Sequence, residues 1–214
     1  MSSSIPSYPD ALRGHVSANP QVLAALRRDP VLGQLCDLFG AYAWDVHAPL
    51  FSLCRAVVGQ RISSRAASSI FQRLYQATRI DPVQLLAHDE AHLRSLGLPK
   101  SKAKSLHALA HYALEGSLEK LEQQDNAQII LELSRLPGVG LWTVQMLLIF
   151  SLARLDVLPM RDLGVIRAAE RLYGVPNDDK NALQALERRL QPYGSVAAWY
   201  FWRWSEAGSP DLQP

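Results

Sequence analysis

Two stretches of the sequence hold residues whose types and spacing could do chemistry: LPGVG at 136–140, and Asp162, which opens the run DLGVIRAAERLYG. Glycines on both sides of Val139 allow a tight turn whose main-chain amides are not covered by side chains. At the N-terminus of a following helix, such amides and the helix dipole favour an anion such as phosphate. The first stretch therefore predicts a phosphate grip, although a simple turn between two packed helices would use the same residues.

Asp162 stands directly before an apolar segment of helical period, which is where a helix N-cap belongs. Capping is the common role of an aspartate in such a place. The N-terminus of a helix also keeps a carboxylate ionised, so the same position suits an electrostatic stabiliser or a general base. Its place downstream of the LPGVG turn makes Asp162 a candidate for both roles.

The elements that must position these residues are helices. Apolar residues recur at helical spacing along most of the chain, and no alternating run rich in β-branched residues competes with them. We expect an all-α protein in which one helix ends near Leu136 and the next begins near Leu141. These two helices occupy 126–135 and 141–153. The other expected helices occupy 49–76 with a break near Gly59, 81–87, 89–96, 101–114, 162–173, 178–190 and 195–205, and two more are expected near the N-terminus, one starting at Asn19–Pro20 and one between Pro30 and Gly40.

Composition limits the remaining classes of protein. A chain of 214 residues with 48% hydrophobic content can bury a sizeable core, and its net charge of +2 permits a nucleic-acid partner without demanding one. Cys36 and Cys54 are too few for a disulfide framework and lack metal-ligand spacing, so we interpret them as buried thiols. No apolar run has membrane-spanning length, and MSSSIPSYPD lacks the features of a signal peptide, which predicts an intracellular protein without a membrane partner.

Taken together, LPGVGLWTVQMLLIF and the following LPMRDLGVIRAAERLYG resemble the signature of the helix–hairpin–helix DNA glycosylase superfamily, and within it the alkylpurine branch of the DNA-3-methyladenine glycosylase II type. Three further stretches agree with this resemblance: AVVGQRISSRAASSIFQRL, GLPKSKAKSLHALA and QPYGSVAAWYFWRW. The match runs in order over roughly residues 46–204, which makes it far more specific than the turn alone.

The resemblance implies a fold of two helical subdomains with an active-site cleft between them. One subdomain is a helical barrel over 47–153, with the helix–hairpin–helix at 126–153. The other combines residues 1–46 with residues 154–214 and carries Asp162.

The resemblance also implies roles for individual residues. Asp162 falls on the catalytic aspartate of the family. The hairpin residues that hold the DNA backbone are Leu136, Gly138, Val139 and Gly140. A monovalent cation often binds this hairpin, whereas no catalytic metal and no cofactor are expected. Trp142 stands where relatives that also cut the backbone have a lysine nucleophile, and since tryptophan forms no Schiff base, a monofunctional enzyme that leaves an abasic site is implied.

The implied chemistry suits these residue types. A purine such as 3-methyladenine or 7-methylguanine is cationic, so it leaves with little acid assistance, and one carboxylate can stabilise the oxocarbenium-like sugar or activate water. The nucleotide must be flipped out of the duplex, and electron-rich aromatic rings attract a cationic base. The candidate pocket residues are Trp142, Trp44, Tyr193 and Trp199, each of which core packing would also explain.

Two positions depart from the family pattern. After Gln60 the family usually has a glutamine or an apolar residue that fills the gap left by the flipped base, whereas this chain has Arg61, so Arg61 and Ile62 are alternative wedge residues. Gly194 replaces a common arginine, which removes one expected contact. A group of alternating lysines could add to the electrostatic footprint on DNA or form a solvated face: Lys100, Lys102 and Lys104.

The sequence therefore predicts a monomeric, monofunctional glycosylase that releases alkylated purines from double-stranded DNA. An intracellular location is expected in any case, and if the source is bacterial, the cytoplasm with the nucleoid. One alternative is the same scaffold acting on deaminated or etheno bases. Another is a non-catalytic helix–hairpin–helix DNA-binding protein in which Asp162 only caps a helix. The second alternative leaves the match through GQRIS and DLGVIR unexplained.

Overall fold

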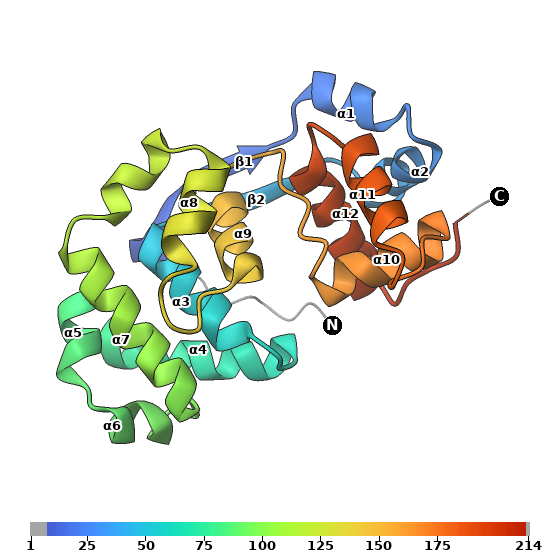
Figure 1. Ribbon diagram of the computed structural model, residues 1–214. Coiled ribbons are helices and arrows are strands. Elements are labelled where there is room, and N and C mark those ends of the chain that lie inside the picture. Colours follow the sequence, from blue (N-terminus) through green and yellow to red (C-terminus); the bar gives the residue numbers. More distant parts are fainter. Residues whose placement is uncertain (1–7, 213–214) are drawn as a thin grey trace. The chain divides into compact units, whose positions relative to one another are not determined.

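The computed structural model describes residues 8–212, and this part of the chain is mostly helical (Figure 1). The helices are α1 (Pro20–Leu26), α2 (Pro30–Phe39), α3 (Pro49–Gly59), α4 (Ser64–Thr78), α5 (Pro82–Ala87), α6 (Glu90–Ser95), α7 (Lys100–Leu114), α8 (Asn126–Leu133), α9 (Leu141–Phe150), α10 (Leu163–Tyr173), α11 (Lys180–Arg189) and α12 (Gly194–Glu206). Short 3₁₀ turns cover Pro9–Ala11 and Leu118–Gln123. The predicted helical fold is confirmed, and none of the described helices is long and apolar enough to cross a membrane.

A small sheet is the exception to the predicted all-helical fold. Strands β1 (Leu12–Ser17) and β2 (Ala43–His47) pair into two strands. The sequence of β1, LRGHVS, is largely exposed and has no buried apolar alternation. Apolar periodicity, on which the helix predictions depend, therefore carries no signal for it.

The chain folds as two compact units, each built from two segments. Within the described residues, unit 1 contains residues 8–14 together with Val46–Leu152, and unit 2 contains His15–Asp45 together with residues 153–212. The resemblance implies instead that all residues up to 46 belong to the terminal subdomain. Residues 8–14 lie in unit 1 because Tyr8 packs edge-on against aromatic rings of that unit. Its ring-centroid distances are 5.2 Å to Phe51, 5.6 Å to Phe71 and 4.7 Å to Tyr75.

Helix α3 is the centre of unit 1. It packs against α4, α7 and α9, and α7 in turn packs against α5 and α6 (Figure 1). Residues 143–149 of α9 are all buried, which explains why LWTVQMLLIF is apolar on every side. Cys54 lies fully buried in α3 as a free thiol, as predicted, and burial raises its pKa. The hairpin between α8 and α9 is therefore supported by a dense core.

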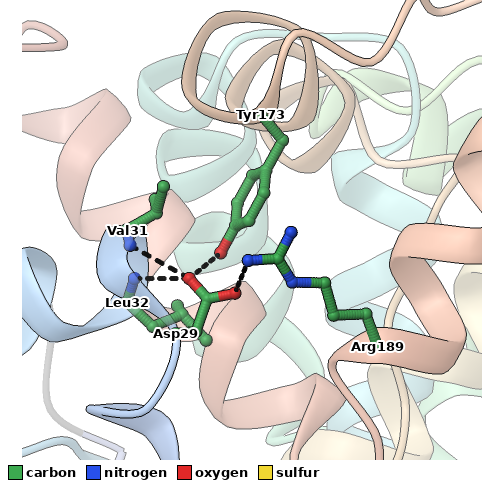
Figure 2. Close-up of polar contacts among 5 residues, drawn as sticks. All are labelled: Asp29, Val31, Leu32, Tyr173 and Arg189. Atoms are coloured by element: carbon green, nitrogen blue, oxygen red, sulfur yellow. Dashed lines mark hydrogen bonds and ion pairs between the residues drawn. The ribbon is translucent and has the colours of Figure 1, made fainter.

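Helix α12 is the centre of unit 2, where it packs against α2 and α10. A partly buried polar cluster joins α2, α10 and α11 (Figure 2). Asp29 caps α2, and its Oδ1 accepts hydrogen bonds from the main-chain N–H groups of Val31 and Leu32 and from the Tyr173 hydroxyl at 3.0 Å. Its Oδ2 lies 2.7 Å from Nη2 of Arg189. Burial, followed by the Asp29 charge, raises the pKa of Tyr173, so this hydroxyl remains a donor at neutral pH.

We expect Asp29→Ala to lower the free energy of unfolding by about 2–4 kcal/mol, because it removes a cap and leaves the Tyr173 hydroxyl without its acceptor. Asp179 is a matched control, since it caps α11 through the N–H groups of Asn181 and Ala182 alone and is exposed. Asp179→Ala should cost only about 1 kcal/mol. Denaturant titration of both variants measures the difference, and equal losses would show that the contacts of Asp29 with Tyr173 and Arg189 add nothing to the cap.

Candidate active site and nucleic-acid interface

The turn between α8 and α9 depends on one of its two glycines. Gly138 has a φ of +74°, a left-handed conformation that favours glycine, and a Cβ there would collide with Oγ of Ser105 on α7. Gly140 has φ −103° and ψ 176°, which any residue can adopt. No atom of the described residues other than Gly140 and its two chain neighbours lies within 4 Å of the position of a Cβ at Gly140. The turn thus requires Gly138, whereas Gly140 leaves the approach to the N-terminus of α9 open.

The hairpin presents main chain outward and anchors itself with apolar side chains. Val139 is buried, and its N–H donates to the carbonyl of the half-buried Leu136 at 3.2 Å. Within residues 8–212, no side chain forms a capping hydrogen bond at the N-terminus of α9. An uncapped helix N-terminus behind a small residue is suited to an anion such as a backbone phosphate.

A cation at this hairpin stays a prediction. The described residues contain no group of three or more His, Cys, Asp or Glu side chains that could hold a metal ion. A monovalent cation would therefore be held by main-chain carbonyl oxygens, a ligand type that hard cations accept. The Leu136 carbonyl already accepts the Val139 N–H, and the Gly138 carbonyl accepts an amide N–H of Gln60 at 2.9 Å.

The two predicted wedge residues lie in the loop that joins α3 to α4. Arg61 has a φ of +57°, which is uncommon for a residue with a side chain, and it is exposed. Ile62 beside it is 39% exposed although it is apolar. The loop therefore presents both side chains to solvent, as a wedge into a base stack requires.

The three alternating lysines have different surroundings. Lys102 is turned inward, and its Nζ donates to the carbonyls of Val58 at 2.7 Å and Gln60 at 2.9 Å. Lys100 lies 3.8 Å from a carboxylate oxygen of Glu90, and Lys104 is exposed. Lys102 therefore holds the end of α3 and is not part of a freely solvated face, whereas a contribution of these lysines to DNA binding stays a prediction.

Asp162 caps α10 in unit 2, as its place in the sequence predicts. Its Oδ1 accepts hydrogen bonds from the N–H groups of Gly164 at 2.9 Å and Val165 at 3.2 Å. A third donor, Nε1 of Trp202 on α12, lies 2.9 Å from the same oxygen. A Cβ at Gly164 would lie only 3.1 Å from both the Trp202 ring and this oxygen. Glycine at 164 thus allows the indole to reach the carboxylate, and three N–H groups fix its orientation.

Trp202 is the site residue that sequence reasoning missed. It lies in the run QPYGSVAAWYFWRW, where the resemblance pointed to Trp199 instead. Trp199 packs edge-on against Tyr200 at 4.9 Å, with the guanidinium of Arg203 5.7 Å from the centre of its ring. The signal for Trp202 in the sequence is Gly164, because a glycine just after the acid indicates close approach by another group.

The four predicted pocket aromatics are divided between the units. Trp142, in unit 1, is half-buried, and its ring lies against Gly59 at the end of α3. Trp44, Tyr193 and Trp199 belong to unit 2. Trp44 is buried in β2 beside Tyr42, and Tyr193 is the half-buried residue before α12. Their role in binding a base stays a prediction.

Gly194 has a packing role that accounts for the missing arginine. A Cβ at this position would lie 2.9 Å from the main-chain nitrogen of Leu158, so no larger side chain fits without a shift. The neighbouring Ser195 is fully buried, and its N–H donates to the Leu155 carbonyl at 2.9 Å while its Oγ accepts the N–H of Val157 at 3.1 Å. The start of α12 is thereby joined to the segment that leads to Asp162.

We expect Trp202→Phe to lower the rate of any reaction that uses Asp162 by about tenfold, because phenylalanine keeps most of the ring volume but cannot donate to Oδ1. The loss should appear in kcat, with DNA affinity close to wild type, since the indole N–H holds the carboxylate. Single-turnover kinetics and a binding titration separate the two quantities. An unchanged kcat would show that the two main-chain donors suffice.

Comparison with known proteins also indicates a DNA repair protein. A family model described as the HhH-GPD superfamily base excision DNA repair protein matches residues 54–192, a range that contains the hairpin and Asp162. DNA-3-methyladenine glycosylase 1 of Schizosaccharomyces pombe is 32% identical over 185 residues, which are 81% of this chain and 81% of that protein. Alkylbase DNA glycosidase-like protein mag2 of the same yeast is 30% identical over 166 residues, which are 73% of this chain and 78% of that protein.

Solved structures agree. The S. pombe 3-methyladenine DNA glycosylase Mag1, in complex with abasic DNA, matches with a TM-score of 0.81 and 29% identity, covering 90% of this chain and 100% of that one. The family match thus includes the turn, the capping aspartate and the fold around them. The chain belongs to the HhH-GPD superfamily of base excision DNA repair proteins.

Proposed function

We propose that this protein is a monofunctional DNA glycosylase that hydrolyses the N-glycosidic bond of alkylated purines, of the 3-methyladenine and 7-methylguanine type, in double-stranded DNA. The observation that carries the proposal is the carboxylate of Asp162, whose Oδ1 is held by three N–H donors in a chain that also has an uncapped hairpin helix. The names of its relatives, DNA-3-methyladenine glycosylase and 3-methyladenine DNA glycosylase, support the substrate class.

Binding begins at unit 1 in this proposal. The hairpin amides around Gly140 hold a backbone phosphate, and Arg61 or Ile62 enters the base stack as the damaged nucleotide leaves it. These contacts involve phosphate and stacking, not base edges, so they carry little sequence preference. Lesion choice therefore depends on how readily a base flips and how well aromatic rings hold a cationic one.

Bond cleavage depends on unit 2. As the C1′–N bond breaks, the departing electron pair neutralises the cationic purine, so no acid need protonate it. The positive charge that develops on the sugar is stabilised by the Asp162 carboxylate. Water then adds to C1′, and its proton passes to Asp162 or to solvent. Trp142 carries no amine, so no Schiff base forms there and the product is an intact strand with an abasic site.

Release of free base from methylated duplex DNA tests the proposal. The purified protein should liberate 3-methyladenine or 7-methylguanine, and the strands should remain intact until alkali is added. Breaks before alkali would contradict the monofunctional assignment. Release of only deaminated or etheno bases from a parallel set of duplexes would replace the substrate class, and DNA binding without release of any base would favour the non-catalytic alternative.

A further inference from the structure

Two elements of unit 1 that the proposed function places on DNA are joined by one side chain. Gln60 follows the last residue of α3 and begins the loop that carries Arg61 and Ile62. Its Nε2 donates to the carbonyl of Gly138 in the hairpin at 2.9 Å and to Oγ1 of Thr143 at 2.8 Å. Both N–H groups of the amide are thus used on the hairpin and the first turn of α9.

A lysine fixes the same loop from the other side. Nζ of Lys102 donates to the carbonyls of Val58 and Gln60, which are among those left without helical partners at the end of α3. An ammonium group also suits the negative end of the helix dipole. Desolvation lowers the pKa of Lys102, in keeping with its inward position.

The main chain turns sharply just beyond these contacts. Arg61 takes its left-handed conformation directly after Gln60, so the wedge residues project from a point held by both side chains. On the hairpin side, the fit of Gly138 against Ser105 of α7 leaves little room for movement. Helix α7 also carries Lys102. Loop, hairpin and α7 therefore form one connected support.

We propose that Gln60 and Lys102 are positioning residues that hold the Arg61–Ile62 loop at a fixed distance from the phosphate-binding hairpin, so that gripping the backbone sets how deeply the wedge enters the duplex. This inference rests on the proposed function. Unstacking a base step costs a few kcal/mol, and the contact between the wedge and the neighbouring bases offsets this cost. A loop that could move away from the duplex would lose part of that contact. The two residues touch neither base nor phosphate in this role.

Spin labels test, without DNA or catalysis, whether Gln60 and Lys102 fix the distance between the Arg61–Ile62 loop and the hairpin. Cysteines are introduced at Ile62 and Arg135, which are both exposed, and the distance distribution between the labels is measured. Gln60→Met keeps the length of the side chain but has no donor, and Lys102→Met removes the ammonium group. Each should broaden the distribution, whereas Lys102→Arg should restore it. Distributions as narrow as in the parent protein would overturn the inference, whatever the enzyme does.

Base flipping gives the second readout, in proteins without the labels. Fluorescence of 2-aminopurine beside a lesion should show flipping reduced about tenfold in Gln60→Met and Lys102→Met, the size expected when hydrogen bonds to a buried or charged group are lost. Lys120→Met, an exposed lysine of the same unit, is the matched control and should flip as wild type does. An equal loss in that control would mean that charge alone matters, which would overturn the inference.

Salt dependence separates a support from a phosphate contact. Loss of one phosphate contact lowers the magnitude of the slope of log K against log salt by about 0.9. Because Lys102 contacts no phosphate in this proposal, Lys102→Met should leave the slope unchanged.

If Lys102→Met fails to fold, Thr143→Val, which removes only one acceptor of Gln60, should give the same broadening and reduced flipping. If the wild-type protein releases no base, the proposed function is contradicted, but the distances between the labels still test whether Gln60 and Lys102 hold the loop. If the wild-type protein is active and the variants show the same label distances and base flipping as wild type, only the positioning role of Gln60 and Lys102 is contradicted.

Discussion

Asp162→Asn is expected to lower base release by about 10²–10³-fold, the range found when one group that stabilises transition-state charge is removed. Asparagine is as good an N-cap as aspartate, and its oxygen can still accept from Gly164, Val165 and Trp202. Only the negative charge is lost. Single-turnover release of base measures the effect, and the free energy of unfolding and DNA affinity should match wild type.

Asp162→Ala is the companion variant, because it removes the cap as well as the charge. It should lose activity to the same extent and about 1 kcal/mol of stability besides. The pair therefore separates the two roles of this residue. If Asp162→Asn released base at the wild-type rate, Asp162 would be a cap only, and the non-catalytic reading of this site would gain support.

Gly138→Ala is expected to disrupt the hairpin and with it DNA binding. The left-handed φ of +74° and the collision with Oγ of Ser105 both oppose a side chain, and we expect a loss of about 1–3 kcal/mol in the free energy of unfolding. DNA affinity should fall at least tenfold, since the turn sets where the amides point. Calorimetry and a binding titration measure the two effects. Adding Ser105→Gly should restore part of the stability by removing the collision.

Gly140→Ala is the matched control two residues away. Its backbone conformation is ordinary and the space around it is open, so stability should stay within about 0.5 kcal/mol of wild type. The new methyl group would nevertheless lie on the approach to the N-terminus of α9, and we expect DNA affinity to fall several-fold. Normal DNA binding by Gly140→Ala would contradict the assignment of this helix end to phosphate.

Most of the fold could be predicted because residues next to the ends of most helices mark where those helices begin. Aspartates at 29, 81, 89, 125, 162 and 179 accept hydrogen bonds from first-turn N–H groups, and prolines open α1, α2, α3 and α5. Such signals depend only on neighbours in the sequence. The pairing of β1 with β2 depends on residues far apart in the chain, and the exposed sequence of β1 carries no apolar pattern that would reveal it.

In the candidate site, too, the features that depend on neighbouring residues could be predicted, and those that depend on residues far apart in the chain could not. The cap formed by Asp162 and the turn at Gly138 follow from local sequence, and the structure shows both. The partner of the carboxylate, Trp202, lies 40 residues further along, and helical spacing alone does not say which aromatic residue of α12 faces Asp162. The different roles of Gly138 and Gly140 also required the fold, because only packing shows that Ser105 closes one position and leaves the other open.

The division of the chain into segments has a consequence for folding during synthesis. Both flanks of His15–Asp45 belong to unit 1, and the N–H of Ala48 donates to the Ala11 carbonyl at 2.8 Å, so this segment leaves and returns as a closed loop. Its own packing partners emerge from the ribosome much later: Tyr173 lies 144 residues beyond Asp29, and Tyr200 lies 160 beyond Gly40. Unit 1 can therefore fold first, before the partners of His15–Asp45 have been synthesised. Because both ends of this segment are then already held by unit 1, it loses less conformational entropy when it packs against the later segment of unit 2.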